Sequence, residues 1–142
     1  MNNIETNSYE SEPSVEKNID HVLYHVAGFE PNPDDEIIEL HPGTQNATGQ
    51  GIYFTESFPQ VKFAGGEKNQ SRWNLPHVNI FKVALDHEES KNWFRAKNKP
   101  MRPRFWHSKN KTIRFNNRYE EQEIAGQMCH IYSDVIDDNI EQ

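Results

Sequence analysis

Short hydrophobic runs separated by turn-forming residues dominate the chain. The run from His21 to Ala27, which Gly28 ends, predicts a strand. Residues 78–85 are rich in Val, Ile and Phe and are the most strand-like stretch of all. Residues 111–115 alternate between polar and apolar positions, as a half-buried strand does. Residues 123–132 predict one or two further short strands.

The middle of the chain mixes turn signals with two shorter candidate elements. Residues 35–40 predict a short helix or a strand, and Gly49-Gln50-Gly51 introduces a predicted strand at residues 52–54. A proline near the start and two glycines after the end favour a short helix over residues 59–64. Several short strands with few helical segments predict an α+β fold.

The polar ends of the chain set the expected domain boundaries. A length of 142 residues favours one domain. Residues 1–19 are polar and acidic and are expected to form a disordered tail, and residues 135–142 are expected to form a second acidic tail. The folded domain is therefore expected to span residues 20–134.

The composition predicts a modest core in a reducing compartment. A mean hydropathy of -0.97 is low for a folded domain, although the aromatic side chains compensate because each buries a large area. The lone cysteine, Cys129, excludes an intrachain disulfide and is expected to be a small buried hydrophobic residue. Neither a membrane-spanning run nor a secretory leader is visible, so a cytoplasmic location, or delivery into a host cytoplasm by a signal-less route, is expected.

Charge is unevenly distributed along the chain. The net charge is -7, yet residues 91–118 contain ten Lys and Arg residues and no acidic residue. This basic stretch also contains Trp93, Phe94, Phe105 and Trp106. It is either a contact surface for an acidic protein, a nucleic acid or the NAD pyrophosphate, or a solvated segment whose aromatic side chains anchor in the core.

One central motif carries a family resemblance. The segment Gly51-Ile52-Tyr53-Phe54-Thr55-Glu56-Ser57 follows a strand with Tyr24-His25 and precedes Glu121-Gln122-Glu123-Ile124. This order resembles the ADP-ribosyltransferase superfamily, in its His-Tyr-Glu branch, over residues 22–132. With Val61-Lys62-Phe63-Ala64, the motif is also similar to small transferase modules of phage and bacterial polyvalent proteins. The resemblance implies a split antiparallel sheet core with few short helices.

The resemblance also implies an NAD-binding set. Tyr53 would stack on the cationic nicotinamide ring, a contact worth about 0.5–2 kcal/mol. Phe63 would close the other side of that ring, His25 would bind the adenosine ribose, and the Val26 backbone would hold the nicotinamide amide. Phe54 and Thr55 complete the implied NAD-binding residues.

The implied catalytic residues are Glu123, His25 and Tyr53. The Glu123 carboxylate would stabilise the oxocarbenium-like ribose formed when nicotinamide leaves, an effect of about 2.7–4 kcal/mol. Glu121 would orient the acceptor side chain. The Glu-x-Glu pair also resembles arginine-modifying transferases, but these have an Arg and Ser-Thr-Ser where this chain has His25 and residues 54–56, so the His-Tyr-Glu assignment is preferred.

The expected function is a mono-ADP-ribosyltransferase that uses NAD as its substrate and modifies a macromolecule, as a toxin, an effector or a phage-type modifier does. The family places glycine after its His, where this chain has Val26, and this departure keeps open a catalytically inactive binding module. A transferase acting on a small molecule such as an antibiotic is a further alternative. We expect no metal site, because the histidines, among them His77 and His130, have no cysteine partners at zinc spacing. The oligomeric state is left open.

Overall fold

Strands account for most of the chain that the structure describes. The computed structural model describes residues 18–43, 48–56, 75–101, 104–124 and 126–136. The elements within these residues are β1 (His21–Ala27), β2 (Ile37–Leu40), β3 (Tyr53–Thr55), β4 (Val78–Leu85), α4 (His87–Ser90), β5 (Phe94–Arg95), β6 (Phe105–His107), β7 (Ile113–Asn116), β8 (Tyr119–Ile124) and β9 (Gln127–Tyr132).

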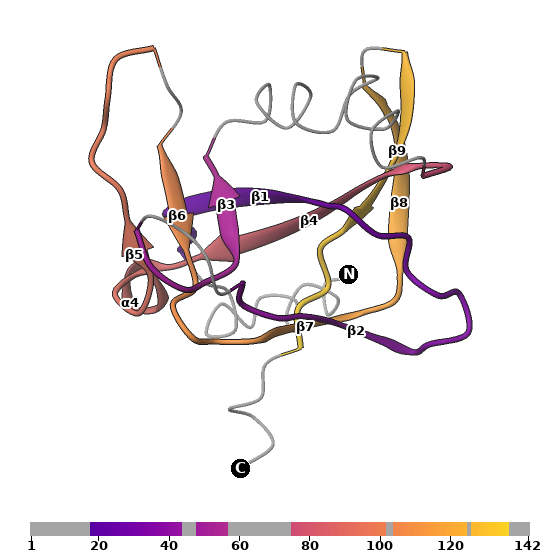
Figure 1. The fold of residues 1–142 in the computed structure, drawn as a ribbon, viewed down its shortest axis with the longest axis horizontal. Coiled ribbons are helices and arrows are strands. Elements are labelled where there is room, and N and C mark those ends of the chain that lie inside the picture. The colour runs from indigo at the N-terminus through magenta and orange to yellow at the C-terminus, as the bar shows by residue number, and fades with distance from the viewer. Residues whose placement is uncertain (1–17, 44–47, 57–74, 102–103, 125, 137–142) are drawn as a thin grey trace, which may run out of the picture.

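The strands form one large sheet and one small one. The large sheet has the order β5-β6-β3-β1-β4-β9-β8, and β2 pairs with β7 in the small sheet. β1 and β4 run across the molecule, with β3, β5 and β6 on one side and β8 and β9 on the other (Figure 1). Most pairs are antiparallel, but β4 and β9 are parallel. The described part is thus mainly β-structure with little helix, which is compatible with α+β, and its large sheet is mixed rather than wholly antiparallel.

The main core lies where one face of the large sheet packs against β2 and β7. Phe81 of β4 is fully buried, and its ring centroid lies 4.9 Å from that of Phe115 on β7 and 4.7 Å from that of Tyr132 on β9. Leu23 and Phe54 are also fully buried in this cluster. The burial follows from the alternation of side chains along a strand, which places every second residue of β1 and β4 on this face.

The opposite face of the large sheet carries a smaller cluster. Val78, Ile80, Cys129 and Ile131 are buried there, and Tyr24, Val26 and Ile124 pack against them. Cys129 is only 3% exposed, which confirms the buried, hydrophobic role expected for it. Burial raises the pKa of its thiol, so the reactive thiolate is disfavoured.

The hydrophobic pattern predicts the long strands and misses the short elements. β1 and β4 are confirmed at the expected bounds, and residues 37–40 form a strand. β5 and β6 have two and three residues and are stabilised by pairing with neighbours, which no periodicity can reveal. The expected helix over residues 59–64, and residues 1–17 of the tail expected over residues 1–19, lie outside the described residues. Near the C-terminal boundary, Val135 pairs with Phe115.

Candidate functional site

A hydrogen bond joins the first two residues of the expected site. Nδ1 of His25 on β1 lies 2.7 Å from the backbone oxygen of Tyr53 on β3. Because a carbonyl oxygen only accepts, Nδ1 carries the proton and donates it. Tyr24 of β1 lies opposite Thr55 of β3 in the antiparallel pairing of these strands. The neighbouring His25 side chain adds a further hydrogen bond between the same two strands. The structure therefore brings the His25 side chain to the backbone of Tyr53. The two side chains themselves lie on opposite faces of the sheet, because His25 packs against Phe54, which alternates with Tyr53 along β3.

The environment of His25 favours the neutral imidazole. Burial lowers the pKa of His25, and the hydrogen bond to the Tyr53 backbone opposes this only in part. The neighbouring ring of Phe54 lies 5.4 Å away, centroid to centroid. With the proton on Nδ1, the lone pair on Nε2 is available as an acceptor.

The side chain of Tyr53 packs among aromatic residues at the β6 side of the sheet. Its ring centroid lies 4.9 Å from that of His107 and 5.5 Å from that of Phe105. Its hydroxyl donates to the Gly49 carbonyl at 2.6 Å and lies 2.8 Å from Oγ1 of Thr48. Tyr53 is half-buried, so its ring is partly open to solvent while the hydroxyl secures the preceding turn.

The remaining residues expected to bind NAD have different surroundings. The Phe54 side chain is fully buried and makes an edge-on contact with Trp93, so any contact to a ligand would come from its backbone. Thr55 is half-buried opposite Tyr24. The side chain of Val26 packs against the smaller cluster, on the face of β1 opposite His25. Phe63 lies outside the described residues.

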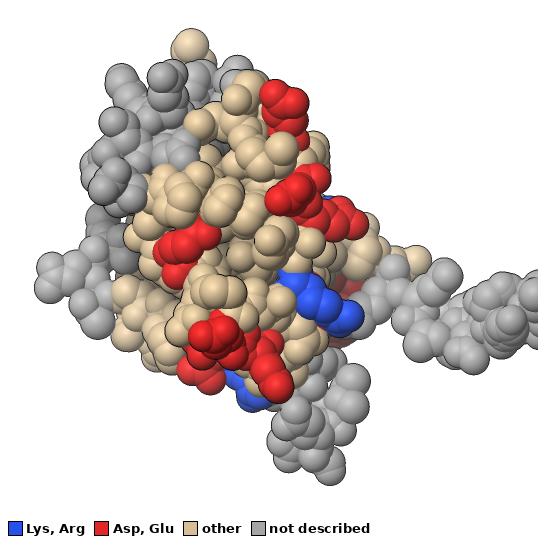
Figure 2. Space-filling view, turned by 90° about the vertical axis from the view of Figure 1, so that its right-hand side faces the viewer, with Lys and Arg blue, Asp and Glu red and all other residues tan. Residues whose placement is uncertain are grey.

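Glu121 and Glu123 lie on β8, at the far edge of the large sheet. β1, β4 and β9 separate β8 from β3 in the strand order, so the described strands do not bring Glu123 next to Tyr53. Glu123 is exposed and pairs in register with Met128, and Glu121 pairs with His130. The charged side chains on the face of the molecule at this edge are mostly acidic (Figure 2). An anionic pyrophosphate would be repelled here and favoured nearer the basic stretch.

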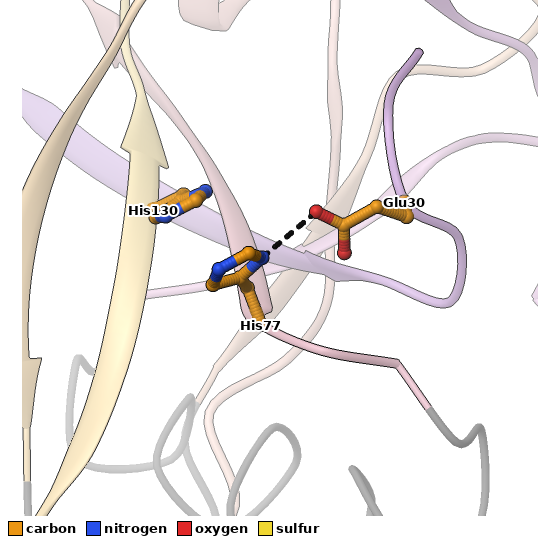
Figure 3. Close-up of side chains that lie close together, drawn as sticks. All are labelled: Glu30, His77 and His130. Atoms are coloured by element: carbon orange, nitrogen blue, oxygen red, sulfur yellow. Dashed lines mark hydrogen bonds and ion pairs between the residues drawn. The ribbon is translucent and has the colours of Figure 1, made fainter. Parts of the chain in front are cut away.

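A second group of polar residues, which are far apart in the sequence, lies next to β8. Nδ1 of His77, the residue before β4, lies 3.0 Å from Oε2 of Glu30, and the rings of His77 and His130 stack at 4.0 Å (Figure 3). Tyr119 stacks on the other side of His130 at 3.9 Å. The fully buried Asn79 donates from Nδ2 to Oε1 of Glu30 at 2.9 Å. Three aromatic rings and two amide or carboxylate groups thus form one polar cluster.

The basic stretch contributes aromatic side chains to the core. Trp93 is 7% exposed and Trp106 is 1% exposed, and both belong to the main cluster. Nε1 of Trp106 donates to Glu56 at 2.6 Å, and the guanidinium of Arg95 lies over the Trp106 ring at 5.0 Å. These two tryptophans are therefore anchors rather than surface platforms, as one of the two sequence interpretations expects. A contact role for the cations of the stretch stays a prediction.

Comparison with known proteins adds no assignment. No protein-family model, curated protein or solved structure matches this chain. No helix among the described residues is long and apolar enough to span a membrane. The structure offers two polar sites as candidates for function, His25 with the Tyr53 backbone and the cluster around His130.

The sequence offered only a weak signal for the second cluster. Glu30, His77 and His130 are far apart along the chain, and the spacing rules for metal ligands look for neighbouring residues. The parallel pairing of β4 with β9 is what sets Asn79 opposite His130. A histidine within a hydrophobic strand was the one available clue, and it does not identify a partner.

Proposed function

We propose that this chain binds NAD and transfers ADP-ribose from it to a macromolecular target. The observation that carries the proposal is the hydrogen bond from Nδ1 of His25 to the Tyr53 carbonyl. It joins the side chain of one residue that the family resemblance assigns to the nucleotide to the backbone of the other, across two neighbouring strands; a bound NAD would therefore have to pass the edge of β3 to meet both His25 and the Tyr53 ring. It also leaves Nε2 of His25 as an acceptor suited to a ribose hydroxyl.

The neutral state of His25 suits this ligand. NAD has a positively charged nicotinamide ring, and an imidazolium beside it would repel that charge. Burial lowers the pKa of His25, which keeps the imidazole uncharged near neutral pH. A partly open Tyr53 ring adds a surface on which a cationic ring can stack.

Glu123 enters the proposal through the family resemblance. Its carboxylate would stabilise the charge that develops on the ribose as nicotinamide leaves. Glu123 and Glu121 are both exposed on β8, which suits residues that meet a separate acceptor molecule. Transfer requires that the ribose reach this carboxylate. Because three strands separate β8 from β3, catalysis depends on whether bound NAD extends to Glu123.

A binding module without catalysis is the second candidate function. Two observations favour it: three strands lie between β3 and β8, and Val26 stands where the family has glycine. Such a module would keep the His25 and Tyr53 pair and bind a nucleotide or a partner protein without breaking NAD.

The experiment measures NAD binding and ADP-ribose transfer separately. Calorimetry with NAD tests binding for the wild type and for His25→Ala. Labelled NAD incubated with a host lysate tests transfer for the wild type, Glu123→Gln and Glu120→Gln. Glu120 is the matched control, because it is an exposed glutamate on β8 whose side chain alternates to the other face of the sheet.

The two candidates predict different results. The transferase predicts NAD binding that His25→Ala weakens, together with labelling of a macromolecule that Glu123→Gln abolishes and Glu120→Gln preserves. NAD binding without labelling or NAD turnover would support the binding module. Absence of NAD binding at millimolar ligand would overturn the nucleotide site itself. A labelled small molecule in place of a macromolecule would change the acceptor class and keep the reaction.

A further inference from the structure

Three side chains from separate segments converge beside β9. Glu30 follows β1, His77 precedes β4 and His130 lies within β9. One carboxylate oxygen of Glu30 and one ring nitrogen of each histidine all lie within 4.8 Å of one another (Figure 3). Two imidazoles and one carboxylate are a set of ligands that binds zinc and related metals in many proteins.

The cluster contains buried polar atoms without partners. His130 is 4% exposed, and its Nε2 has no hydrogen-bond partner among the described residues. A Glu121 carboxylate oxygen lies 3.5 Å from that nitrogen, longer than the roughly 2.7–3.2 Å of an ordinary hydrogen bond. Buried polar atoms are nearly always satisfied in folded proteins, so an imidazole nitrogen with only this long contact to Glu121 among the described residues points to a further ligand.

We propose that Glu30, His77 and His130 bind one divalent transition-metal ion, for which Zn²⁺ is the probe. The two nitrogens and one oxygen would supply three ligands, and the Glu121 carboxylate or a water molecule would complete a tetrahedral set. Mg²⁺ and Ca²⁺ prefer oxygen ligands and suit this site less well. The inference departs from the expectation of no metal site, which rested on spacing along the chain.

Binding requires a small rearrangement of the cluster. Ligand atoms around tetrahedral zinc lie about 3.3 Å apart, given bonds of about 2.0–2.1 Å. The ligand atoms that are up to 4.8 Å apart must therefore move closer together. The His77 and His130 rings are stacked, and their in-plane lone pairs must turn toward a common point. The His77 side chain is 37% exposed and precedes the strand, so it can rotate while β9 holds His130.

The surrounding residues already orient two of the three ligands. Asn79 donates to Oε1 of Glu30, which leaves Oε2 directed at His77. Burial and the neighbouring His77 lower the pKa of His130, although Glu121 and Glu30 oppose this shift. A neutral imidazole is the form that binds a metal. The three proposed metal ligands lie apart from His25 and Tyr53 on β1 and β3, and only Glu121 is common to the two proposals.

The test is zinc titration of the full chain, prepared without a polyhistidine tag. Calorimetry measures the stoichiometry and affinity at pH 7.5, and Co²⁺ absorption reports on ligand geometry. The variants are His77→Ala and Glu30→Gln, both at partly exposed positions that folding tolerates better than a change at buried His130. His87→Ala is the matched control, because His87 is an exposed histidine that lies 3.8 Å from the Asp20 carboxylate.

The expected result is one zinc ion per chain, with an affinity that falls at least tenfold in His77→Ala and in Glu30→Gln. His87→Ala should bind zinc as the wild type does, and zinc should raise the unfolding temperature of the wild type but not of His77→Ala. If the wild type does not bind zinc at about 1 mM, a concentration at which even weak binding would be detected, the proposed site is wrong. Equal loss in the His87 variant, or unchanged binding in both cluster variants, would overturn it as well.

Discussion

Gly51 packs so closely against His107 that a Cβ atom at position 51 would lie 2.5 Å from Nδ1 of the imidazole. The same atom would lie 2.8 Å from Cγ and 2.9 Å from Cβ of His107, so a small shift of one atom cannot relieve the clash. The ring is also fixed, because Nε2 bonds to the Thr48 carbonyl and Nδ1 accepts from the Lys109 backbone. The glycine that opens the central motif is thus required by packing.

We expect Gly51→Ala to lower the free energy of unfolding by about 1–3 kcal/mol, the usual cost of forcing extra atoms into a packed region. Gly51→Ala should lower the free energy of unfolding by clearly less in a His107→Ala background, because the clashing ring is then absent. Urea denaturation of the two single variants and the double variant measures this coupling. Equal costs in both backgrounds would show that the glycine serves another purpose.

Phe81 connects the two sheets through Phe115 and should dominate core stability. Phe81→Ala is expected to lower the free energy of unfolding by about 3–5 kcal/mol, because a fully buried ring is replaced by a cavity. Phe29→Ala is the control: its ring also contacts Phe81, at 6.2 Å, but Phe29 is 40% exposed. Denaturation midpoints compare the two variants. A loss at Phe29 as large as that at Phe81 would contradict this description of the core.

The sequence predicts the fold best where local pattern and tertiary packing agree. β1 and β4 are rich in apolar residues because both faces of these central strands are covered, and their bounds follow directly. β6 contains only residues 105–107, and its pairing with β3 depends on residues far away in the chain. No local signal carries such long-range pairing.

The candidate site was predictable only in part, for the same reason. The motif order indicated His25 and Tyr53, and the structure places these residues on the neighbouring strands β1 and β3. The partners of Glu121 were not foreseeable, because the β8–β9 register places it opposite His130. The cluster of Glu30, His77 and His130 depends on three separate segments, so only the folded chain reveals it.

Stability should fall on acidification in a way that depends on His25. A lowered pKa in the folded state means that the unfolded chain binds more protons between the folded pKa and about 6.5, the ordinary histidine value. The free energy of unfolding therefore decreases as the pH falls below about 6.5. His25→Gln keeps a side-chain N–H for the Tyr53 carbonyl but cannot titrate, so its pH dependence should be shallower.

Urea denaturation at pH 7.5 and 5.5 compares the wild type with His25→Gln. The free energy of unfolding at pH 7.5 measures the structural cost of the substitution. The difference between the free energies at pH 7.5 and pH 5.5 measures the contribution of titrating groups. A residual slope in the variant is expected, because burial also lowers the pKa of His130. Parallel changes in the two proteins would show that His25 does not contribute to the acid sensitivity.

The two parts of Tyr53 should have separable roles. The hydroxyl bonds to Gly49 and Thr48, whereas the ring is the surface proposed for nicotinamide. Tyr53→Phe should lower stability by about 0.5–1.5 kcal/mol, the net value of a typical hydrogen bond, and leave NAD affinity nearly unchanged. Tyr53→Ala should weaken NAD binding by about 0.5–2 kcal/mol, or roughly twofold to thirtyfold, because the stacking surface is lost.

Calorimetry with NAD, on variants shown to be folded by circular dichroism, measures both affinities. If Tyr53→Phe weakened NAD binding as much as Tyr53→Ala, the hydroxyl and the turn that it secures would be the recognition element, and the stacking role of the ring would be wrong.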